Sequence, residues 1–461
     1  MPTSPEFRPA RTHAALGGEF YDLVQPASFP QHILRHRDQR QAARLGLDGL
    51  TDAEWIAHFG RFEPMPGSFE TPLALRYHGH QFRHYNPDLG DGRGFLFAQM
   101  HDLKDGRLLD FGTKGSGQTP WSRGADGRLT LKGGIREILA TSMLEALGVE
   151  TSKSFSLIET GEDLQRHDEP SPTRAAVLVR LSHSHIRIGT FQRLAYLADE
   201  ASLSALLAHA VRHYLPEAAN VDEPERAALF FAAVTRRVAR MGAQWMAAGF
   251  VHGVLNTDNI NNTGESFDYG PWRFLPTYDP AFTAAYFDHG GLYAFGRQPE
   301  TLLWNLARLG GCLLPLGDIE PRLETTLNGF GALLEAEFAQ AVLWRLGLSS
   351  LGAERDAALA GLFFAALLES KAPFEQAFYD WRGGRQRDYP HPAWAPFRAA
   401  IASYEPRAPE HPYFAHKAPA TLLIEEVEAL WAPIAERDDW SSFHAKLAAI
   451  EAARLAYHAA D

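Results

Sequence analysis

Cysteine is almost absent from this chain, since Cys312 is the only one among 461 residues. A single thiol cannot form an intramolecular disulfide, and it excludes zinc sites built from several cysteines. Cys312 lies in the segment GGCLLPLG, where a small, buried and unreactive side chain is the simplest interpretation. The lack of disulfides is typical of proteins that work in a reducing compartment.

Long apolar runs and an excess of positive charge are also missing. No stretch reaches the about 20 apolar residues that a membrane-spanning helix needs, and the first twenty residues contain no apolar core of a signal peptide. The net charge of -12 argues against a general nucleic-acid-binding protein, which normally carries a basic surplus. We therefore expect a soluble, cytoplasmic monomer that binds neither nucleic acid nor membranes.

The spacing of apolar residues predicts an α+β protein with two lobes. Between residues 73 and 181, short apolar runs alternate with glycine turns, as in strands. After residue 191 most apolar residues have the spacing of amphipathic helices. The expected strands are 94–99, 108–112, 155–160 and 176–181, with a helix at 134–147. Further helical segments are expected at 202–214 and 224–248, and within 301–309, 325–346, 354–368 and 419–454.

These patterns divide the chain into three expected parts. Residues 1–67 are mixed in composition and rich in proline, which predicts an N-terminal extension wrapped around the core. Residues 68–190 are expected to form a sheet-containing N-lobe, and residues 191–461 a helical C-lobe with a C-terminal helical extension. The polar loop 252–270 belongs to the C-lobe.

The segment HGVLNTDN, from His252 to Asn259, is the strongest candidate for a catalytic loop. Kinase-type phosphotransferases place an aspartate two residues after the histidine and an asparagine further on, which binds magnesium together with a later aspartate. Here Val254 occupies the first aspartate position and cannot accept a proton, whereas Asn259 fills the asparagine position. Asp258 directly precedes Asn259, and Asp268 follows in FDYGP. Their oxygen atoms suit Mg²⁺ or Mn²⁺, although a turn rich in asparagine is an alternative.

A lysine and a glutamate form a second candidate pair. Lys114, in DFGTKGSG, follows a predicted strand among glycines, where its ammonium group can reach phosphate oxygens. Glu137 lies on the predicted helix 134–147, and kinase-type sites use a helical glutamate to hold such a lysine towards the phosphates. An exposed lysine at a strand end and a glutamate on a solvated helix face are the alternatives.

Glycine turns and two arginines supply further candidates. The turn LGDGRG, with Gly90, Gly92 and Arg93, precedes a predicted strand, and such turns can cover phosphates with backbone N–H groups. However, this segment contains one of three Asp-Gly-Arg tripeptides, the others being 105–107 and 126–128, and Asp-Gly is also favoured in simple hairpin turns.

Arg180 and Arg187 lie seven residues apart in VLVRLSHSHIRIG. Their convergence on a triphosphate is the functional interpretation, and ordinary ion pairs are the alternative. His183 and His185 lie between them without a third metal ligand at suitable spacing.

Taken together, these segments resemble the selenoprotein O family, whose bacterial members are also called YdiU. The resemblance rests on YHGHQF, LGDGRG, the Lys114 loop, TPWSRGADGR, IRE, SHIRIGTFQ, HGVLNTDN and FDYGP, which follow one another between residues 77 and 288. It implies a pseudokinase with a protein-kinase-like two-lobe fold. It also implies that the protein binds ATP in a flipped orientation, with Mg²⁺ or Mn²⁺, and transfers AMP to Ser, Thr or Tyr hydroxyls of proteins.

The resemblance also implies roles for individual residues. A reversed nucleotide presents its α-phosphorus to the acceptor, so the usual base at the position of Val254 is not needed and Asp258 takes that role. The implied catalytic residues are Lys114, Glu137 and Asp258. The implied metal ligands are Asn259 and Asp268. The residues implied to contact the nucleotide are Gly90, Gly92, Arg93, Lys114, Asp126, Gly127, Arg180, Arg187 and Asp268.

Two other functions remain open at this point. The pattern HGxxxxxN also resembles antibiotic and choline phosphotransferases, so a kinase-like phosphotransferase is the first alternative, and Val254 argues against it. The second is a catalytically inactive nucleotide-binding scaffold. The presence of every polar residue of the candidate site argues against it.

Overall fold

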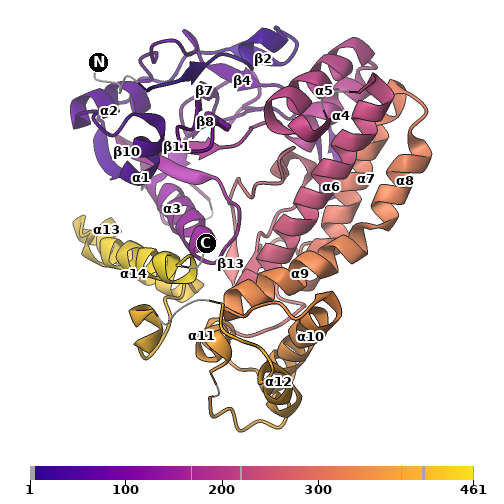
Figure 1. Cartoon of the computed structure of the whole chain (residues 1–461). Coiled ribbons are helices and arrows are strands. Elements are labelled where there is room, and N and C mark those ends of the chain that lie inside the picture. Colours follow the sequence, from indigo (N-terminus) through magenta and orange to yellow (C-terminus); the bar gives the residue numbers. More distant parts are fainter. Residues whose placement is uncertain (1–5, 168, 219–220, 386, 408–410, 460–461) are drawn as a thin grey trace.

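An antiparallel sheet occupies the first part of the chain (Figure 1). A computed structural model describes residues 6–167, 169–218, 221–385, 387–407 and 411–459. The central strands are β7 (Leu96–His101), β8 (Leu108–Lys114), β11 (Thr173–Ser182) and β10 (Lys153–Leu164), in this spatial order. The four expected strands each overlap one of them. The shorter strands are β4 (Leu73–Leu75) and β2 (Tyr21–Leu23) beyond β7, β3 (Ile33–Arg37) beyond β10, β1 (Pro9–Ala10) on β7, and β9 (Leu129–Thr130) on β11.

The first 67 residues contribute strands and two helices to this part of the molecule. β2 and β3 pair with β4 and β10 at opposite edges of the sheet. The helices are α1 (Gln39–Leu45) and α2 (Asp52–Phe59). Trp55 of α2 stacks on Phe155 at a ring distance of 4.8 Å and donates a hydrogen bond from Nε1 to Ser156 Oγ. This segment therefore covers one face of the sheet. The boundaries of the three expected parts stay predictions.

Helix α3 (Leu131–Ala146) covers the other face of the sheet and begins three residues earlier than expected. Thr130 caps its N-terminus, since its hydroxyl accepts a hydrogen bond from the backbone of Gly133. A Cβ atom at Gly134 would lie 2.4 Å from Leu157 of β10. The glycine thus lets α3 pack closely on the sheet.

Only one of the three Asp-Gly-Arg tripeptides is a hairpin turn. Gly106, with φ of +74°, lies in the turn that joins the paired strands β7 and β8. Strands β5 (Gly79–Gln81) and β6 (His84–Asn86) pair with each other, and the tripeptide 91–93 connects β6 to β7, with which β6 does not pair. The tripeptide 126–128 precedes β9, which pairs with the distant strand β11. For these two segments the hairpin interpretation is wrong.

The second part of the chain is mainly helical, as expected, and the molecule as a whole is a mixed α/β protein (Figure 1). Its helices are α4 (Ile188–Tyr196), α5 (Glu200–Tyr214), α6 (Glu223–Ala248), α7 (Gln298–Leu313), α8 (Glu320–Asn328), α9 (Phe330–Leu346), α10 (Ala353–Ser370), α11 (Phe374–Trp381), α12 (Trp394–Ile401), α13 (Ile424–Arg437) and α14 (Ser441–Tyr457). The short α4, α11 and α12 were not singled out from the sequence. None of the described helices combines the length and apolar character that crossing a bilayer requires.

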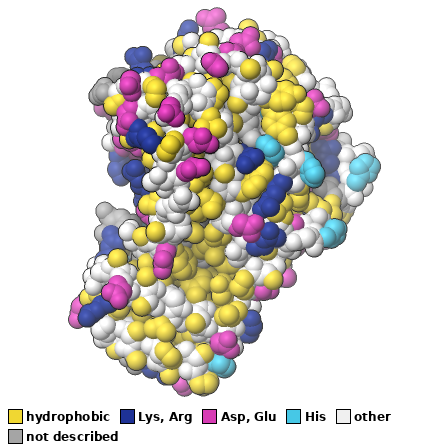
Figure 2. Space-filling view, turned by 90° about the vertical axis from the view of Figure 1, so that its right-hand side faces the viewer, with side chains coloured by type: hydrophobic (Ala, Val, Ile, Leu, Met, Phe, Trp, Pro, Cys, Tyr) yellow, Lys and Arg dark blue, Asp and Glu magenta, His cyan; other side chains and the backbone are white. Residues whose placement is uncertain are grey.

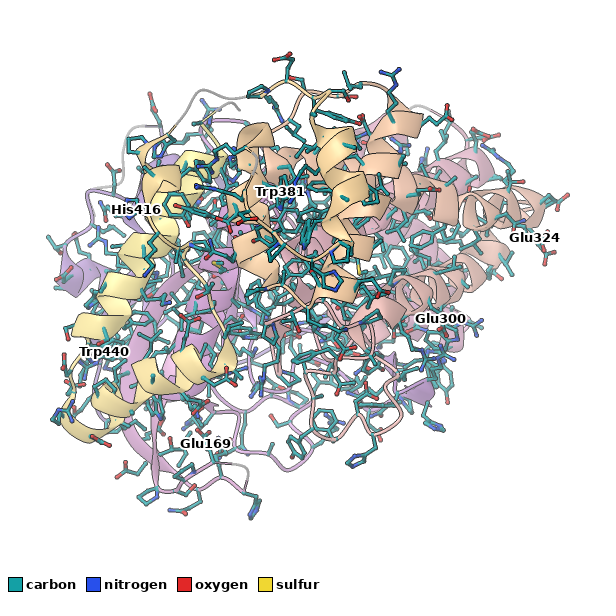
Figure 3. All side chains as sticks on the ribbon, turned by 90° about the horizontal axis from the view of Figure 1, so that it is seen from below. Glu169, Glu300, Glu324, Trp381, His416 and Trp440 are labelled. Atoms are coloured by element: carbon teal, nitrogen blue, oxygen red, sulfur yellow. The ribbon has the colours of Figure 1, made fainter. Side chains whose placement is uncertain are left out.

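Aromatic side chains fill the centre of the helical part. Trp381 of α11 stacks on Trp394 of α12 at a ring distance of 5.6 Å, and Figure 3 shows it surrounded by these helices. On the face seen in Figure 2, side chains of both charges are interspersed, and apolar side chains gather in its lower half.

The last two helices join the sheet to the helical part. α13 and α14 lie beside α3 (Figure 1), and Lys132 Nζ of α3 is 2.7 Å from Glu428 Oε2 of α13. Tyr457, at the end of α14, packs in the helical part with its ring 5.2 Å from Arg345 and 4.7 Å from Arg382. The C-terminal helices thus contact both parts of the molecule.

Candidate active site

Three cationic side chains meet at the carboxylate of Asp268. Lys114 Nζ and Arg180 Nη1 lie 3.4 Å and 2.9 Å from Asp268 Oδ1. Arg187 Nη1 lies 3.1 Å from Asp268 Oδ2. Burial alone raises the pKa of this carboxyl group, but the cations around it hold that pKa well below its usual value. Asp268 is therefore ionised at neutral pH, and four residues singled out from the sequence lie together.

The register of β8 against β11 brings two of the cations together. Lys114 is opposite Leu178, and Gly112 is opposite Arg180. Lys114 and Arg180 are therefore diagonal neighbours whose side chains project from the same face of the sheet. A Cβ atom at Gly112 would lie 2.0 Å from His185 Nε2, so no larger residue fits there.

Lys114 and Glu137 form a buried ion pair. Lys114 Nζ is 2.6 Å from Glu137 Oε2, and their side chains are only 7% and 1% exposed. Arg180 Nη1 lies 3.5 Å from the other carboxylate oxygen of Glu137, which has no hydrogen-bond partner. Neither a solvated helix face nor an exposed strand end describes these residues. Because a buried charge is costly unless paired, each partner offsets the cost of burying the other.

The loop that contains Asp258 is held in place by buried residues. Val254, at the position of the usual kinase base, packs against the apolar core. The backbone of His252 donates a hydrogen bond to Gln298 Oε1 at 3.0 Å, and His252 Nε2 lies 3.1 Å from the carbonyl oxygen of Phe267. Val254 therefore has a structural role here and cannot take part in proton transfer.

Asp258 lies in the short helix η3 (Thr257–Asn259). Its side chain is buried, and its Oδ1 atom has no hydrogen-bond partner. Burial raises the pKa of Asp258 to about 6, against the opposing effect of Arg187, while the charge of Asp268 contributes to the increase. A carboxylate with this pKa is suited to act as a general base near neutral pH.

The β5–β6 hairpin holds this loop from the other side. The backbone of His80 donates to Thr257 Oγ1 at 2.7 Å, and that of Phe82 donates to Asn256 Oδ1 at 3.0 Å. A Cβ atom at Gly79 would lie 3.3 Å from Asp258 Oδ1. The first residue of β5 therefore lies directly beside the carboxylate of Asp258.

Asn259 and Asp268 offer oxygen atoms that fit a divalent cation. Asn259 Nδ2 donates to Asp268 Oδ2 at 3.2 Å, which leaves its buried Oδ1 without a partner. Asp268 has a φ of +64°, an uncommon conformation for a residue other than glycine. Two such side chains are typical of Mg²⁺ bound with nucleotide phosphates. Among the residues described, no three His, Cys, Asp or Glu side chains are grouped to hold a metal ion by themselves.

The glycines of LGDGRG are needed for close packing. A Cβ atom at Gly90 would lie 2.4 Å from the ring of Trp121, and one at Gly92 would lie 2.8 Å from the Trp121 carbonyl oxygen. Trp121 Nε1 in turn donates to Asp22 Oδ2 at 2.9 Å. Arg93 is exposed, and its charge is one of those that lower the pKa of Asp268.

Asp126 and Gly127 differ in their relation to this cluster. The carboxylate of Asp126 is exposed and pairs with Arg166 Nη1 at 2.8 Å. The structure therefore does not bring the Asp126 side chain to the cations around Asp268. Gly127, with φ of +69°, packs against Gly117, three residues after Lys114, where a Cβ atom would lie 2.3 Å from the Gly117 backbone.

Three residues of the cluster were not singled out from the sequence. The guanidinium of Arg187 lies between the rings of Tyr77 and Phe267, at 4.6 Å and 4.9 Å. Its Nη2 atom is 3.4 Å from Asp91 Oδ1. Tyr77, Asp91 and Phe267 stand in the blocks YHGHQF, LGDGRG and FDYGP. Their position in these motifs could have indicated them, but no sequence pattern near them shows that they contact Arg187.

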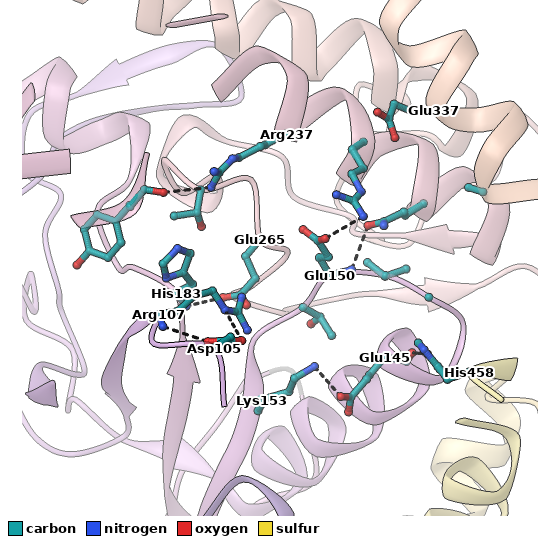
Figure 4. A pocket seen from close by; sticks show the side chains of 18 of the residues that line it. Asp105, Arg107, Glu145, Glu150, Lys153, His183, Arg237, Glu265, Glu337 and His458 are labelled. Atoms are coloured by element: carbon teal, nitrogen blue, oxygen red, sulfur yellow. Dashed lines mark hydrogen bonds and ion pairs between the residues drawn. The ribbon is translucent and has the colours of Figure 1, made fainter. Parts of the chain in front are cut away.

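A cavity of about 1240 Å³ lies elsewhere between the sheet and the helical part (Figure 4). Of the described residues that line it, none belongs to the Asp268 cluster, although Glu265 is only three residues away from Asp268 in sequence. Ion pairs in this cavity join Arg107 to Asp105, Lys153 to Glu145, Arg237 to Glu217 and Arg240 to Glu150. These four cations have carboxylate partners, as those of the Asp268 cluster do, and none of the site residues predicted from the sequence is among the described residues that line the cavity.

Known proteins similar to this chain agree with the resemblance found in its motifs. A family model described as Protein adenylyltransferase SelO matches residues 5–392. A Protein nucleotidyltransferase YdiU from Gloeobacter violaceus is 45% identical over 468 residues, covering 95% of this chain and 93% of that protein. A protein of the same name from Synechocystis sp. is 44% identical over 460 residues, covering 93% of this chain and 95% of that protein. A third, from Synechococcus elongatus, is 50% identical over 355 residues, covering 76% of this chain and 69% of that protein. With most of its length matched in this way, the chain belongs to the protein adenylyltransferase SelO family.

Proposed function

We propose that this protein transfers AMP from ATP to Ser, Thr or Tyr hydroxyls of other proteins, in a metal-dependent reaction with ATP bound in the flipped orientation. The names of the family and of the relatives support the reaction class. The observation that carries the proposal is the exchange of roles in the catalytic loop. Val254 is half-buried and packs against the core where a kinase has its base, whereas Asp258 has a buried carboxylate oxygen without a partner.

At the α-phosphorus of ATP, the proposed step forms one bond and breaks one, and a proton moves to Asp258. The acceptor oxygen attacks the α-phosphorus of ATP while the bond from that phosphorus to the bridging oxygen of the β-phosphate breaks. Diphosphate leaves, and the hydroxyl proton passes to Asp258, which is ionised above a pH of about 6.

Lys114, Arg180 and Arg187 are proposed to hold the distal phosphates. In the structure these cations surround Asp268, so they are already oriented towards a shared negative charge. Cations fixed in place before the reaction stabilise the charge that develops on the leaving diphosphate. The remaining proposed nucleotide contacts are Gly90, Gly92, Arg93, Asp126, Gly127 and Asp268, of which Asp126 requires a movement away from Arg166.

Asn259 and Asp268 would hold Mg²⁺ or Mn²⁺, which supplies positive charge beside the phosphates. The partnerless Oδ1 atom of Asn259 and the ionised carboxylate of Asp268 support this assignment. A kinase-like arrangement of two lobes is part of the same proposal. It is supported by the Lys114–Glu137 pair on the sheet and α3, and by the loop from His252 to Asp268.

Position-specific labelling of ATP tests the reaction. We expect label at the α-phosphate to appear in an acceptor protein, with label at the γ-phosphate found in released diphosphate. Intact-mass analysis should show one added adenosine monophosphate group per modified hydroxyl. Transfer of the γ-label to the acceptor would instead identify a kinase-like phosphotransferase.

The pH dependence of transfer tests the assignment of Asp258. We expect kcat/KM to rise with pH through about 6, because only the ionised carboxylate accepts a proton and burial raises the pKa of Asp258 to about 6. Asp258→Asn should lower the rate by about 10²–10⁴-fold and remove this rise. Unchanged transfer by a folded Asp258→Asn variant would contradict the assignment of Asp258, whereas a folded wild-type protein that transfers nothing would favour the inactive scaffold.

A further inference from the structure

Two exposed aromatic side chains stand out close to the catalytic loop. Tyr286 is 79% exposed and Phe287 is 42% exposed, and their rings lie 5.1 Å apart. The ring of Phe287 also lies 5.9 Å from that of Phe82, at the end of β5. Neighbouring aromatic rings exposed to water are typical of surfaces that bind another molecule. We call Phe82, Tyr286 and Phe287 the aromatic patch.

Hydrogen bonds fix the aromatic patch to the catalytic loop. Tyr293 Oη donates to Asn256 Oδ1 at 2.6 Å, and the backbone of Phe82 donates to the same oxygen at 3.0 Å. The carboxylate of Asp288 accepts hydrogen bonds from the backbones of Leu292 and Tyr293, both at 2.8 Å. The segment with the exposed aromatic residues is therefore ordered and attached two residues away from Asp258.

The length of β5 gives the separation between the aromatic patch and the proposed base. Gly79 begins β5 beside the carboxylate of Asp258. β5 ends at Gln81, and Phe82 follows it in the hairpin turn with a φ of +50°. A strand advances about 3.3 Å per residue, so Phe82 begins the patch within about 10 Å of Gly79. The same rise means that about three residues of an extended acceptor span that distance.

We propose that the aromatic patch binds an apolar side chain of the acceptor polypeptide, about three residues from the hydroxyl that receives AMP. The inference rests on the proposed function, because it takes the acceptor to be a protein whose hydroxyl lies at Asp258. The exposed part of the patch consists of aromatic rings, which pack favourably against aliphatic and aromatic side chains, so the occupant we infer is a side chain of that kind. The patch thereby selects acceptor sequences and takes no part in the bond-forming step.

Peptide acceptors with a single hydroxyl and one leucine at varied positions test this inference. For the wild-type protein, leucine about three residues to one side of the hydroxyl should lower KM about tenfold relative to alanine, as burial of such a side chain allows. The double variant Tyr286→Ser/Phe287→Ser should lose that preference and retain kcat at saturating peptide. Leu455→Ser is the matched control, because it also removes an exposed apolar side chain (52% exposed) but lies on α14.

Three results would overturn the inference and leave the proposed function intact. The first is a KM that does not depend on the position of leucine, and the second is a preference that the double variant retains. The third is concentration-dependent self-association that the double variant abolishes, because the patch would then bind a second copy of the chain. A wild-type protein that transfers no AMP to any acceptor would overturn both this inference and the proposed function, whereas AMP transfer without sequence preference overturns only the inference.

Discussion

Asp268→Asn is expected to lower AMP transfer about a thousandfold while the protein remains folded. Asparagine keeps the size of the side chain but removes the charge that Lys114, Arg180 and Arg187 share. It also removes a proposed metal-ligand oxygen that is already hydrogen-bonded to Asn259. Single-turnover transfer of α-labelled AMP measures the loss, and circular dichroism reports the fold.

Metal binding separates the two contributions of Asp268. Titration with Mn²⁺ in the presence of ATP should show weaker binding for Asp268→Asn than for the wild type. Asp105→Asn provides the control, since Asp105 is an exposed carboxylate that pairs with Arg107 in the β7–β8 turn. Transfer by Asp268→Asn within tenfold of the wild-type rate would contradict the assignment of this residue.

Lys114→Met is expected to have the second large effect, which combines lost activity with lost stability. Transfer should fall about 10²–10³-fold, because a fixed cation beside the leaving phosphates is missing. Glu137, which is 1% exposed, would keep a buried charge with only Arg180 at 3.5 Å to balance it. Loss of one partner from a buried ion pair costs about 3–5 kcal/mol, which chemical denaturation can measure.

The double variant Lys114→Met/Glu137→Gln separates these two effects. Removing the second charge should restore most of the free energy of unfolding, because no buried carboxylate is left unpaired. Activity should stay low, since the cation for the phosphates is still missing. If Glu137→Gln restored AMP transfer as well as stability, Lys114 would be needed only to neutralise Glu137.

The central part of the fold was predictable because its signals are local. β11 carries a continuous apolar run from Ala175 to Val179, and β8 begins with Leu108 and Leu109. α3 has helical apolar spacing bounded by Thr130 and Gly148. β1 and β3, in contrast, were not predicted. Pro9–Ala10 and Ile33–Arg37 have no alternating pattern, and they are strands only because β7 and β10 offer edges with which to pair.

The candidate site shows the same division between local and distant signals. Lys114, Glu137 and Asp268 stand in motifs whose chemistry can be read over a few residues. The contacts of Arg187 with Asp91 and Tyr77 join segments about a hundred residues apart, and no local spacing indicates them. The interpretation of LGDGRG as a phosphate-covering turn also missed a packing requirement, because the ring of Trp121 occupies the space above Gly90.

The two C-terminal helices have a consequence for how far α3 can move relative to the helical part of the molecule. α3 carries Glu137 and is joined to α13 through Lys132 and Glu428, while Tyr457 at the end of α14 is held between Arg345 and Arg382. A rotation that carried α3 away from the helical part would have to break the contacts of that tyrosine with the two guanidinium groups. The end of α14 therefore helps to fix α3, and with it Glu137, to the helical part of the molecule.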